Sequence, residues 1–132
     1  MNEGSRAGRD PVRVLFVEDD RSFAQMYKLK LELDGCHVDI ASDGEMAVEL
    51  ARREPHDIIF LDIRLPKLDG FGVLQALRAN PKTKNIRVVI LSDYSHRELR
   101  ERVAKFGVLD HLIKTETTPA KLSAGLDHWL SS

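Results

Sequence analysis

The sequence has a single cysteine, Cys36, and therefore cannot close a disulfide within the chain. No cysteine or histidine partner lies at zinc-ligand spacing from it, so we expect Cys36 to pack as a small apolar residue in a reducing, cytoplasmic setting. No apolar run reaches the length of a membrane span, and residues 1–10 lack the apolar stretch of a signal peptide. We therefore expect a soluble protein that is not exported.

The sequence also lacks an excess of charge of either sign. Twenty Lys and Arg stand against 21 Asp and Glu, which leaves a formal net charge of -1. This balance gives no field strong enough to hold a nucleic-acid backbone or an anionic membrane, so neither is an expected partner. At 132 residues the chain suits one core. We expect one domain over residues 11–132 and a flexible leader over residues 1–10, with no room for an attached output domain.

Short apolar segments typical of buried strands alternate with segments of helical periodicity. The predicted strands are residues 12–17, 37–41, 57–61, 87–91 and 109–113. The predicted helices are residues 21–33, one opening at a capping box over residues 42–45, and then 71–78, 95–106 and 119–130. The alternation predicts an α/β fold of the flavodoxin-like (βα)5 type, with a five-stranded parallel sheet in the order 2-1-3-4-5.

Two of the predicted helices have clear sequence signals. In the first, Phe23, Tyr27 and Leu31 recur at every fourth position with Met26 beside them, which predicts a buried stripe. The last helix follows Thr118, whose hydroxyl is a candidate N-cap.

Acidic residues follow two strands that this order makes neighbours. Glu18, Asp19 and Asp20 come directly after the first strand, and Asp62 comes directly after the third. Carboxylates gathered at one edge of a sheet repel each other unless a cation intervenes, and Mg²⁺ or Mn²⁺ prefers such oxygen ligands. The alternative is a loop that only caps the first helix, and the acids by themselves do not decide between the two.

A hydroxyl and a cation follow two further strands. Ser92 comes after the fourth strand and Lys114 after the fifth. Each alone is ordinary, because serine often begins a turn and lysine often ends a strand in solvent. Together with the acids they form a set suited to phosphoryl transfer, which needs mainly positioning and charge neutralisation.

Over residues 12–130 the chain resembles the receiver domains of two-component response regulators. The resemblance rests on the segments VLFVEDD, IIFLDIRLPKLDG, VVILSD and HLIK, in that order. It implies that Asp62 is the phosphoacceptor, that Asp19 binds the metal directly and that Glu18 binds it through water. The backbone carbonyl of Arg64 is the implied third protein ligand. Such a domain is not an enzyme acting on a separate substrate, since it catalyses only its own phosphorylation and dephosphorylation.

The resemblance assigns further roles around the phosphoacceptor. Ser92 is expected to donate a hydrogen bond to a phosphoryl oxygen, and Lys114 to pair with another. Pro66, Asp69 and Gly70 match the loop that shapes the site, with proline stiffening the turn and glycine supplying backbone freedom.

The sequence departs from the family pattern after Lys114 and after Ser92. Thr115 stands where most members have proline after a cis bond, and a cis bond without proline costs about 2.5–4 kcal/mol. We therefore predict a trans bond, a reshaped loop and a Lys114 that still reaches the site. Asp93 stands where a small residue is usual. It either repels an incoming phosphoryl group, unless Arg64 or Lys114 pairs with it, or it faces solvent or caps the next helix.

Three more positions are expected to modulate the site. His111 stands where receivers usually carry the Tyr or Phe of the conformational switch. Its smaller, titratable ring would weaken the switch or make it pH-sensitive, but an ordinary exposed histidine is the favoured interpretation. Arg64 and Tyr94 lie two residues beyond Asp62 and Ser92, and their bulk is expected to lengthen the lifetime of the phosphoryl group.

The implied partners are a histidine kinase or a histidine phosphotransfer protein, and an unknown downstream protein. The implied output surface is the face made by the fourth helix, fifth strand and fifth helix. Its candidate contacts are Arg97, Arg100, His111 and Lys121.

Two other functions fit the same fold. One is a degenerate receiver that binds a partner without phosphorylation, which Asp93, His111 and Thr115 favour. The other is a carboxylate-nucleophile phosphohydrolase of small molecules, but Arg64 stands where such enzymes carry their second acid.

Overall fold

The computed structural model describes residues 10–132, and the predicted leader lies outside them except for Asp10. The chain forms one five-stranded sheet in which each pair of neighbouring strands is parallel. The strands are β1 (Arg13–Val17), β2 (His37–Ala41), β3 (Ile58–Asp62), β4 (Arg87–Ser92) and β5 (Asp110–Ile113). Their order is β2-β1-β3-β4-β5, which confirms the predicted flavodoxin-like fold.

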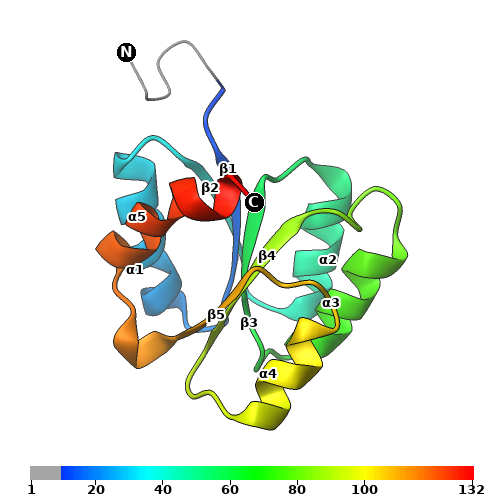
Figure 1. The fold of residues 1–132 in the computed structure, drawn as a ribbon. Helices are drawn as coiled ribbons and strands as arrows, with labels where there is room; N and C mark the ends of the chain where they lie inside the picture. Colours follow the sequence, from blue (N-terminus) through cyan, green and yellow to red (C-terminus); the bar gives the residue numbers. More distant parts are fainter. Residues whose placement is uncertain (1–9) are drawn as a thin grey trace.

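Helices cover both faces of the sheet, with α1 and α5 on one side and α2, α3 and α4 on the other (Figure 1). The α-helices are α1 (Arg21–Leu33), α2 (Gly44–Arg53), α3 (Gly70–Ala79), α4 (Arg97–Ala104) and α5 (Pro119–Leu130). None of the described helices is long and apolar enough to cross a bilayer.

Each face of the sheet has its own apolar core. Phe16 and Phe60 pack beneath α1 and α5, where the Trp129 ring meets the Phe60 ring edge-on at a centroid distance of 5.6 Å. Leu61 and Ile90 belong to the second core, beneath α2, α3 and α4. Because helices cover both faces, β3 is buried along its whole length, as expected for a central parallel strand.

The first helix differs from its prediction in one respect. Tyr27 and Leu31 are buried, but Met26 is 50% exposed and Ala24 completes the buried stripe instead. The C-cap of the helix is Asp34, and Gly35 follows with φ 96°, a left-handed conformation that glycine adopts without strain.

The sequence predicted which segments form helices better than it predicted the residue at which each helix begins. The N-cap of α2 is Asp43, whose carboxylate accepts from the Met46 N–H at 2.8 Å, so the predicted cap at Ser42 is wrong. The N-cap of α4 is His96, so that helix begins at Arg97 and not at the predicted residue 95. Thr118 caps α5 as predicted.

The segment between β5 and α5 forms a short 3-10 helix, Lys114–Glu116. Residues 10–132 contain no cis peptide bond, so the bond between Lys114 and Thr115 is trans, as predicted.

Candidate functional site

The carboxyl ends of the parallel strands bring the predicted polar residues to one edge of the sheet. Glu18 and Asp19 follow β1, Asp62 ends β3, Ser92 ends β4 and Lys114 follows β5. The strand register places Asp62 opposite Leu91 and Ser92 opposite Ile113. Their proximity thus follows directly from the strand order.

Asp62 is the buried carboxylate at the centre of this edge. It is 5% exposed, yet both of its oxygens have donors. The Arg64 backbone N–H donates to one oxygen at 3.1 Å, and the Lys114 ammonium donates to the other at 2.8 Å. Burial together with these two bonds fixes the side chain in one orientation.

Lys114 connects Asp62 to a second buried acid. Its Nζ lies 2.8 Å from Asp62 and 2.5 Å from Glu18, and also 5.0 Å from the centre of the Phe23 ring. Burial on its own lowers the pKa of Lys114, but the bonds to Asp62 and Glu18 outweigh it and hold the pKa above its usual value. The lysine therefore stays cationic at the site, and the missing proline at Thr115 does not displace it.

Glu18 is almost fully enclosed, with 2% of its surface exposed. Burial raises its pKa to about 7, although the bonds from Lys114 and from the Asp20 N–H lower it. Repulsion by Asp62 acts in the same direction as burial. A second cation beside these acids would stabilise both in their charged form.

Glu18, Asp19 and Asp62 offer carboxylate oxygens that all lie within 4.8 Å of one another. This is the oxygen-rich donor set that Mg²⁺ and Mn²⁺ prefer, so the residues present fit such an ion. Asp20 does not belong to this cluster of carboxylates. Its carboxylate caps α1 by accepting a hydrogen bond from the Phe23 N–H at 3.0 Å. The two interpretations of this acidic loop therefore apply to different residues of it.

A cavity of about 190 Å³ opens beside Asp62, between β3, β4 and α4. Arg64 and Tyr94, which both line this cavity, contact each other. The Arg64 guanidinium donates to the Tyr94 hydroxyl at 2.8 Å and lies 5.4 Å from the centre of the Tyr94 ring. Asp93 is exposed, 3.9 Å from the Arg64 guanidinium. Asp93 therefore faces solvent with Arg64 nearby, and it does not cap α4.

Ser92 and His111 contact each other, which corrects the interpretation of His111 as an exposed residue. His111 Nε2 lies 2.7 Å from Ser92 Oγ, and the Ser92 hydroxyl also lies 2.8 Å from the Tyr94 carbonyl oxygen. A carbonyl only accepts, so the hydroxyl proton points to Tyr94 and Nε2–H of His111 donates to Ser92. Burial, followed by the nearby Arg100 charge, lowers the pKa of His111, which favours this neutral ring.

Gly70 shapes the loop after β3, but not through backbone freedom. A Cβ at Gly70 would lie 2.6 Å from the Ile63 Cα and 2.8 Å from the Asp62 carbonyl oxygen. The residue is therefore required for space directly behind the phosphoacceptor candidate. Asp69 caps α3 by accepting from the Gly72 N–H at 3.0 Å.

Sequence reasoning missed six residues that line the cavity, among them Phe71, His96 and Arg102. The Arg102 guanidinium lies 3.6 Å from the centre of the Phe71 ring, and the His96 ring stacks on Tyr94 at 5.9 Å. No sequence signal pointed to them, because the contacts depend on how α4 packs against α3.

The model of the response regulator receiver domain matches residues 14–126 of this chain. A probable chemotaxis protein CheY from Rhizobium etli is 32% identical over 119 residues, which cover 89% of this chain and 92% of that protein. Other curated relatives are longer. The probable transcriptional regulator ycf27 of Guillardia theta is 39% identical over 85 residues, which are 64% of this chain but 34% of that protein.

Solved structures agree with this assignment. The receiver domain of a sensor histidine kinase from Pseudomonas aeruginosa, solved with a magnesium ion in its active-site cleft, has 30% identity and a TM-score of 0.83, covering 92% of this chain and 99% of that one. The chemotaxis protein CheY4 of Vibrio cholerae has 27% identity and a TM-score of 0.84, and the match covers 90% of this chain and 98% of that one. Fold, strand-end residues and matches together show that the chain belongs to the response regulator receiver domains of two-component signalling.

Proposed function

We propose that this receiver domain takes a phosphoryl group from a phosphohistidine onto Asp62 and signals through a protein-binding surface. The donor is a histidine kinase or a histidine phosphotransfer protein. The observation that carries the proposal is the position of Lys114, whose ammonium bonds both Asp62 and Glu18. A buried carboxylate with a buried cation beside it can accept a dianionic group that a lone carboxylate would repel.

In the proposed reaction an Asp62 carboxylate oxygen attacks the phosphorus atom, and the phosphorus–nitrogen bond of the donor breaks. The imidazole nitrogen keeps the bonding electron pair and returns to a neutral ring. Lys114 holds its positive charge next to the oxygens on which negative charge accumulates. The buried position of Asp62 limits the access of water to the acyl phosphate.

Glu18, Asp19, Asp62 and the backbone carbonyl of Arg64 are the residues that would hold Mg²⁺ or Mn²⁺. The ion supplies charge neutralisation between the carboxylates and the incoming group. The carboxylate cluster supports this assignment, as does the magnesium ion in the cleft of the Pseudomonas aeruginosa domain.

Ser92 is the proposed link between phosphorylation and the output surface. Its hydroxyl is already bonded at Tyr94 and His111, so binding a phosphoryl oxygen requires it to release the Tyr94 carbonyl. That exchange would shift the population of two arrangements of the β4–α4 loop. Arg97, Arg100 and Lys121 are exposed on the proposed output face of α4, β5 and α5, whereas His111 is half-buried behind it.

The proposal is tested by incubating the protein with Mg²⁺ and acetyl phosphate and measuring its intact mass. Wild type should gain the mass of one phosphoryl group, and Asp62→Asn should gain none. Asp127→Asn serves as the matched control, because Asp127 is exposed on α5 and makes no side-chain contact with the site.

An unmodified wild type, with an active donor and metal, would contradict the phosphoacceptor role. Sustained turnover of phosphate esters that disappears in Asp62→Asn would indicate a phosphohydrolase instead. The degenerate module finds no support in the comparisons, which match receiver domains, one of them with a magnesium ion in its active-site cleft.

A further inference from the structure

A broad open groove of about 630 Å³ lies at the end of the sheet opposite to Asp62. It runs beside Arg87, the first residue of β4, whereas Ser92 at the phosphoacceptor edge is the last. At the rise of a strand the two ends are roughly 16 Å apart. The groove is therefore separate from the phosphoryl site and from the cavity beside it.

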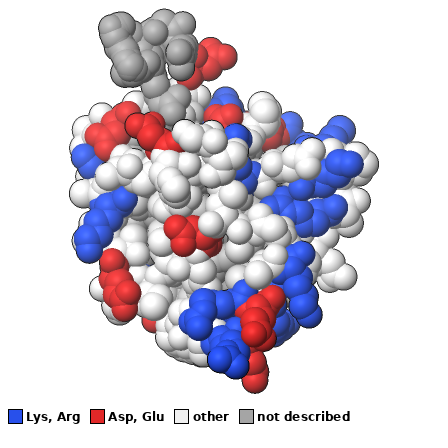
Figure 2. Space-filling view, in the orientation of Figure 1, with Lys and Arg blue, Asp and Glu red and all other residues white. Residues whose placement is uncertain are grey.

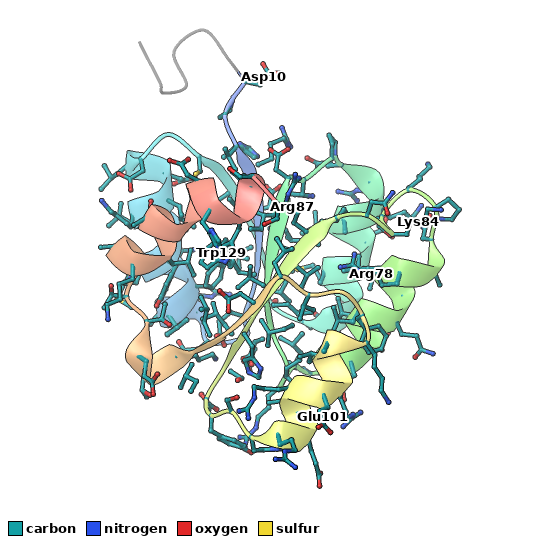
Figure 3. All side chains as sticks on the ribbon, in the orientation of Figure 1. Asp10, Arg78, Lys84, Arg87, Glu101 and Trp129 are labelled. Atoms are coloured by element: carbon teal, nitrogen blue, oxygen red, sulfur yellow. The ribbon has the colours of Figure 1, made fainter. Side chains whose placement is uncertain are left out.

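The charged lining of this groove is entirely basic. Arg78, Lys84, Arg87 and Lys105 line it, and no aspartate or glutamate does. Figure 2 shows Lys and Arg atoms gathered on the right of this face, where Figure 3 labels Arg78 and Lys84. For a chain with a net charge of -1 this is a strong local concentration of one sign.

No aspartate or glutamate of residues 10–132 pairs with these four cations, although many other basic residues of the chain have such a partner. Arg78 donates to the backbone carbonyls of Phe106, Lys84 and Ile86 at 2.7, 3.1 and 2.8 Å. These three carbonyl groups fix the position of the guanidinium. Its positive charge is not neutralised by an acidic side chain among the described residues.

Arg87 is in a similar state. One guanidinium nitrogen donates to the Ser132 carbonyl at 3.1 Å, while its buried Nε has no hydrogen-bond partner among the described residues. Because this Nε is closed to solvent, a carboxylate would bind Arg87 through its terminal nitrogens. Planar guanidinium groups bind carboxylates in this way.

The groove also has an apolar part, formed by Ile86, Phe106 and Leu109. Ile86 and Phe106 are half-buried against the core beneath α3 and α4, and Leu109 is 36% exposed. We propose that this groove binds an acidic segment of a partner protein, in which carboxylates flank an aliphatic or aromatic side chain. The carboxylates pair with the four cations, and the apolar side chain covers Leu109.

Charge and shape favour a peptide over a nucleic acid. Specific nucleic-acid interfaces bury about 600 Å² or more on a broad basic surface, and their affinity comes mainly from phosphate contacts. This groove has only four cations around an apolar centre, which suits a side chain and not a sugar–phosphate backbone. Binding here does not depend on the phosphorylation of Asp62.

The inference is tested by fluorescence anisotropy with a labelled peptide of glutamates and interspersed leucines, titrated with the full chain. Lys84 and Lys105 are exposed, so the double variant Lys84→Glu/Lys105→Glu is expected to fold and to weaken binding roughly tenfold or more. Leu109→Ser tests the apolar contact and should weaken binding without any change of charge. Arg21→Glu is the matched control, because it reverses one exposed cation at the start of α1, at the opposite edge of the sheet, and should leave the affinity unchanged.

Several results would overturn the proposal. They are no binding of the peptide by wild type, equal affinity of wild type and the double variant, and tighter binding of a labelled single-stranded oligonucleotide than of the peptide. Equal affinity for a peptide in which serine replaces leucine would show attraction by charge alone and would also count against it.

Discussion

Ser92 and His111 are joined by a hydrogen bond of 2.7 Å between Oγ and Nε2, which connects the end of β4 to β5. The histidine is neutral in this arrangement, because its buried Nδ1 has no partner among the described residues and a second proton there would find no acceptor. Where most receivers carry a phenol or phenyl ring, this chain therefore has a titratable group in contact with the hydroxyl proposed to bind phosphate.

The first prediction concerns pH. Burial and the positive charges of Arg100 and His96 lower the pKa of His111, while Asp110 opposes them. The unfolded chain then binds more protons, so the free energy of unfolding contributed by His111 is complete above about pH 6.5 and declines as the pH falls through the folded pKa. In urea unfolding at several pH values, His111→Phe should lose less stability on acidification than wild type.

The control is His128→Phe, which replaces an exposed histidine of α5. It should keep the wild-type pH dependence. If His111→Phe also keeps it, the neutral, buried state of His111 is wrong.

The second prediction concerns the pair that spans the cavity beside Asp62. Arg64→Ala removes the bond to the Tyr94 hydroxyl and opens the cavity, so water should reach the acyl phosphate more readily. We expect phosphorylated protein to lose its phosphoryl group about fivefold faster, which corresponds to about 1 kcal/mol of barrier. Intact mass measured against time after removal of the donor gives the rate.

Tyr94→Phe breaks the same bond but keeps the ring, and should have a smaller effect than Arg64→Ala. Arg97→Ala changes an exposed arginine that does not line the cavity and should have none. An unchanged lifetime in Arg64→Ala would show that the pair does not screen the site.

The fold and the strand-end residues could be predicted because they depend on short-range patterns. Apolar runs of buried strands end where polar residues begin, and parallel order brings those ends together. Asp62, Ser92 and Lys114 were located in this way, each within one residue of the end of its strand. Their contacts follow from the register and need no further information.

The remaining errors come from choices that three-dimensional packing decides. Ser42 and Asp43 are both good cap residues, and only the path of the chain into α2 selects Asp43. His111 lies on a strand of four residues in which none is fully buried, so alternation along it indicated no inward face. The basic groove has no sequence signal, because its cations come from α3, β4, the loop between them and the C-cap of α4.

The third prediction concerns a hydrogen-bonded pair between β2 and the segment before β3. Asp39 bonds the fully enclosed His56 ring at 2.8 Å. Burial raises the pKa of Asp39, but the His56 bond and the charge of His37 outweigh it and hold the pKa below the usual value. The charged Asp39 carboxylate therefore stabilises the fold above about pH 3.9. This contribution is lost as the pH falls through the folded pKa of Asp39.

A double-mutant cycle of Asp39→Ala and His56→Ala measures the pair. Chemical denaturation near pH 5 should give a coupling energy of about 1–3 kcal/mol, as expected of a hydrogen bond to a charged group. The coupling should decrease on acidification below about pH 3.9. A coupling that is constant with pH would mean that the charge of Asp39 contributes nothing.

The fourth prediction compares two glycines of α3 that lie two residues apart. Gly70→Ala places a Cβ 2.6 Å from the Ile63 Cα, and backbone atoms cannot move aside without shifting the end of β3. Gly72→Ala places a Cβ 2.4 Å from the Leu68 Cδ1, the end of a flexible, half-buried side chain that can rotate. Gly70→Ala should therefore cost about 1–3 kcal/mol of unfolding free energy, and Gly72→Ala clearly less.

The two variants Gly70→Ala and Gly72→Ala also distinguish an effect on the position of Asp62 from a general loss of stability. Because the Asp62 carbonyl also lies 2.8 Å from the added Cβ, Gly70→Ala should lower the yield of phosphorylated protein even where the variant is fully folded. Unfolding by denaturant and intact mass after incubation with acetyl phosphate give the two quantities on the same samples. Equal phosphorylation of both folded variants would show that the end of β3 tolerates the displacement, and that the position of Asp62 is set by Lys114 and not by the loop behind it.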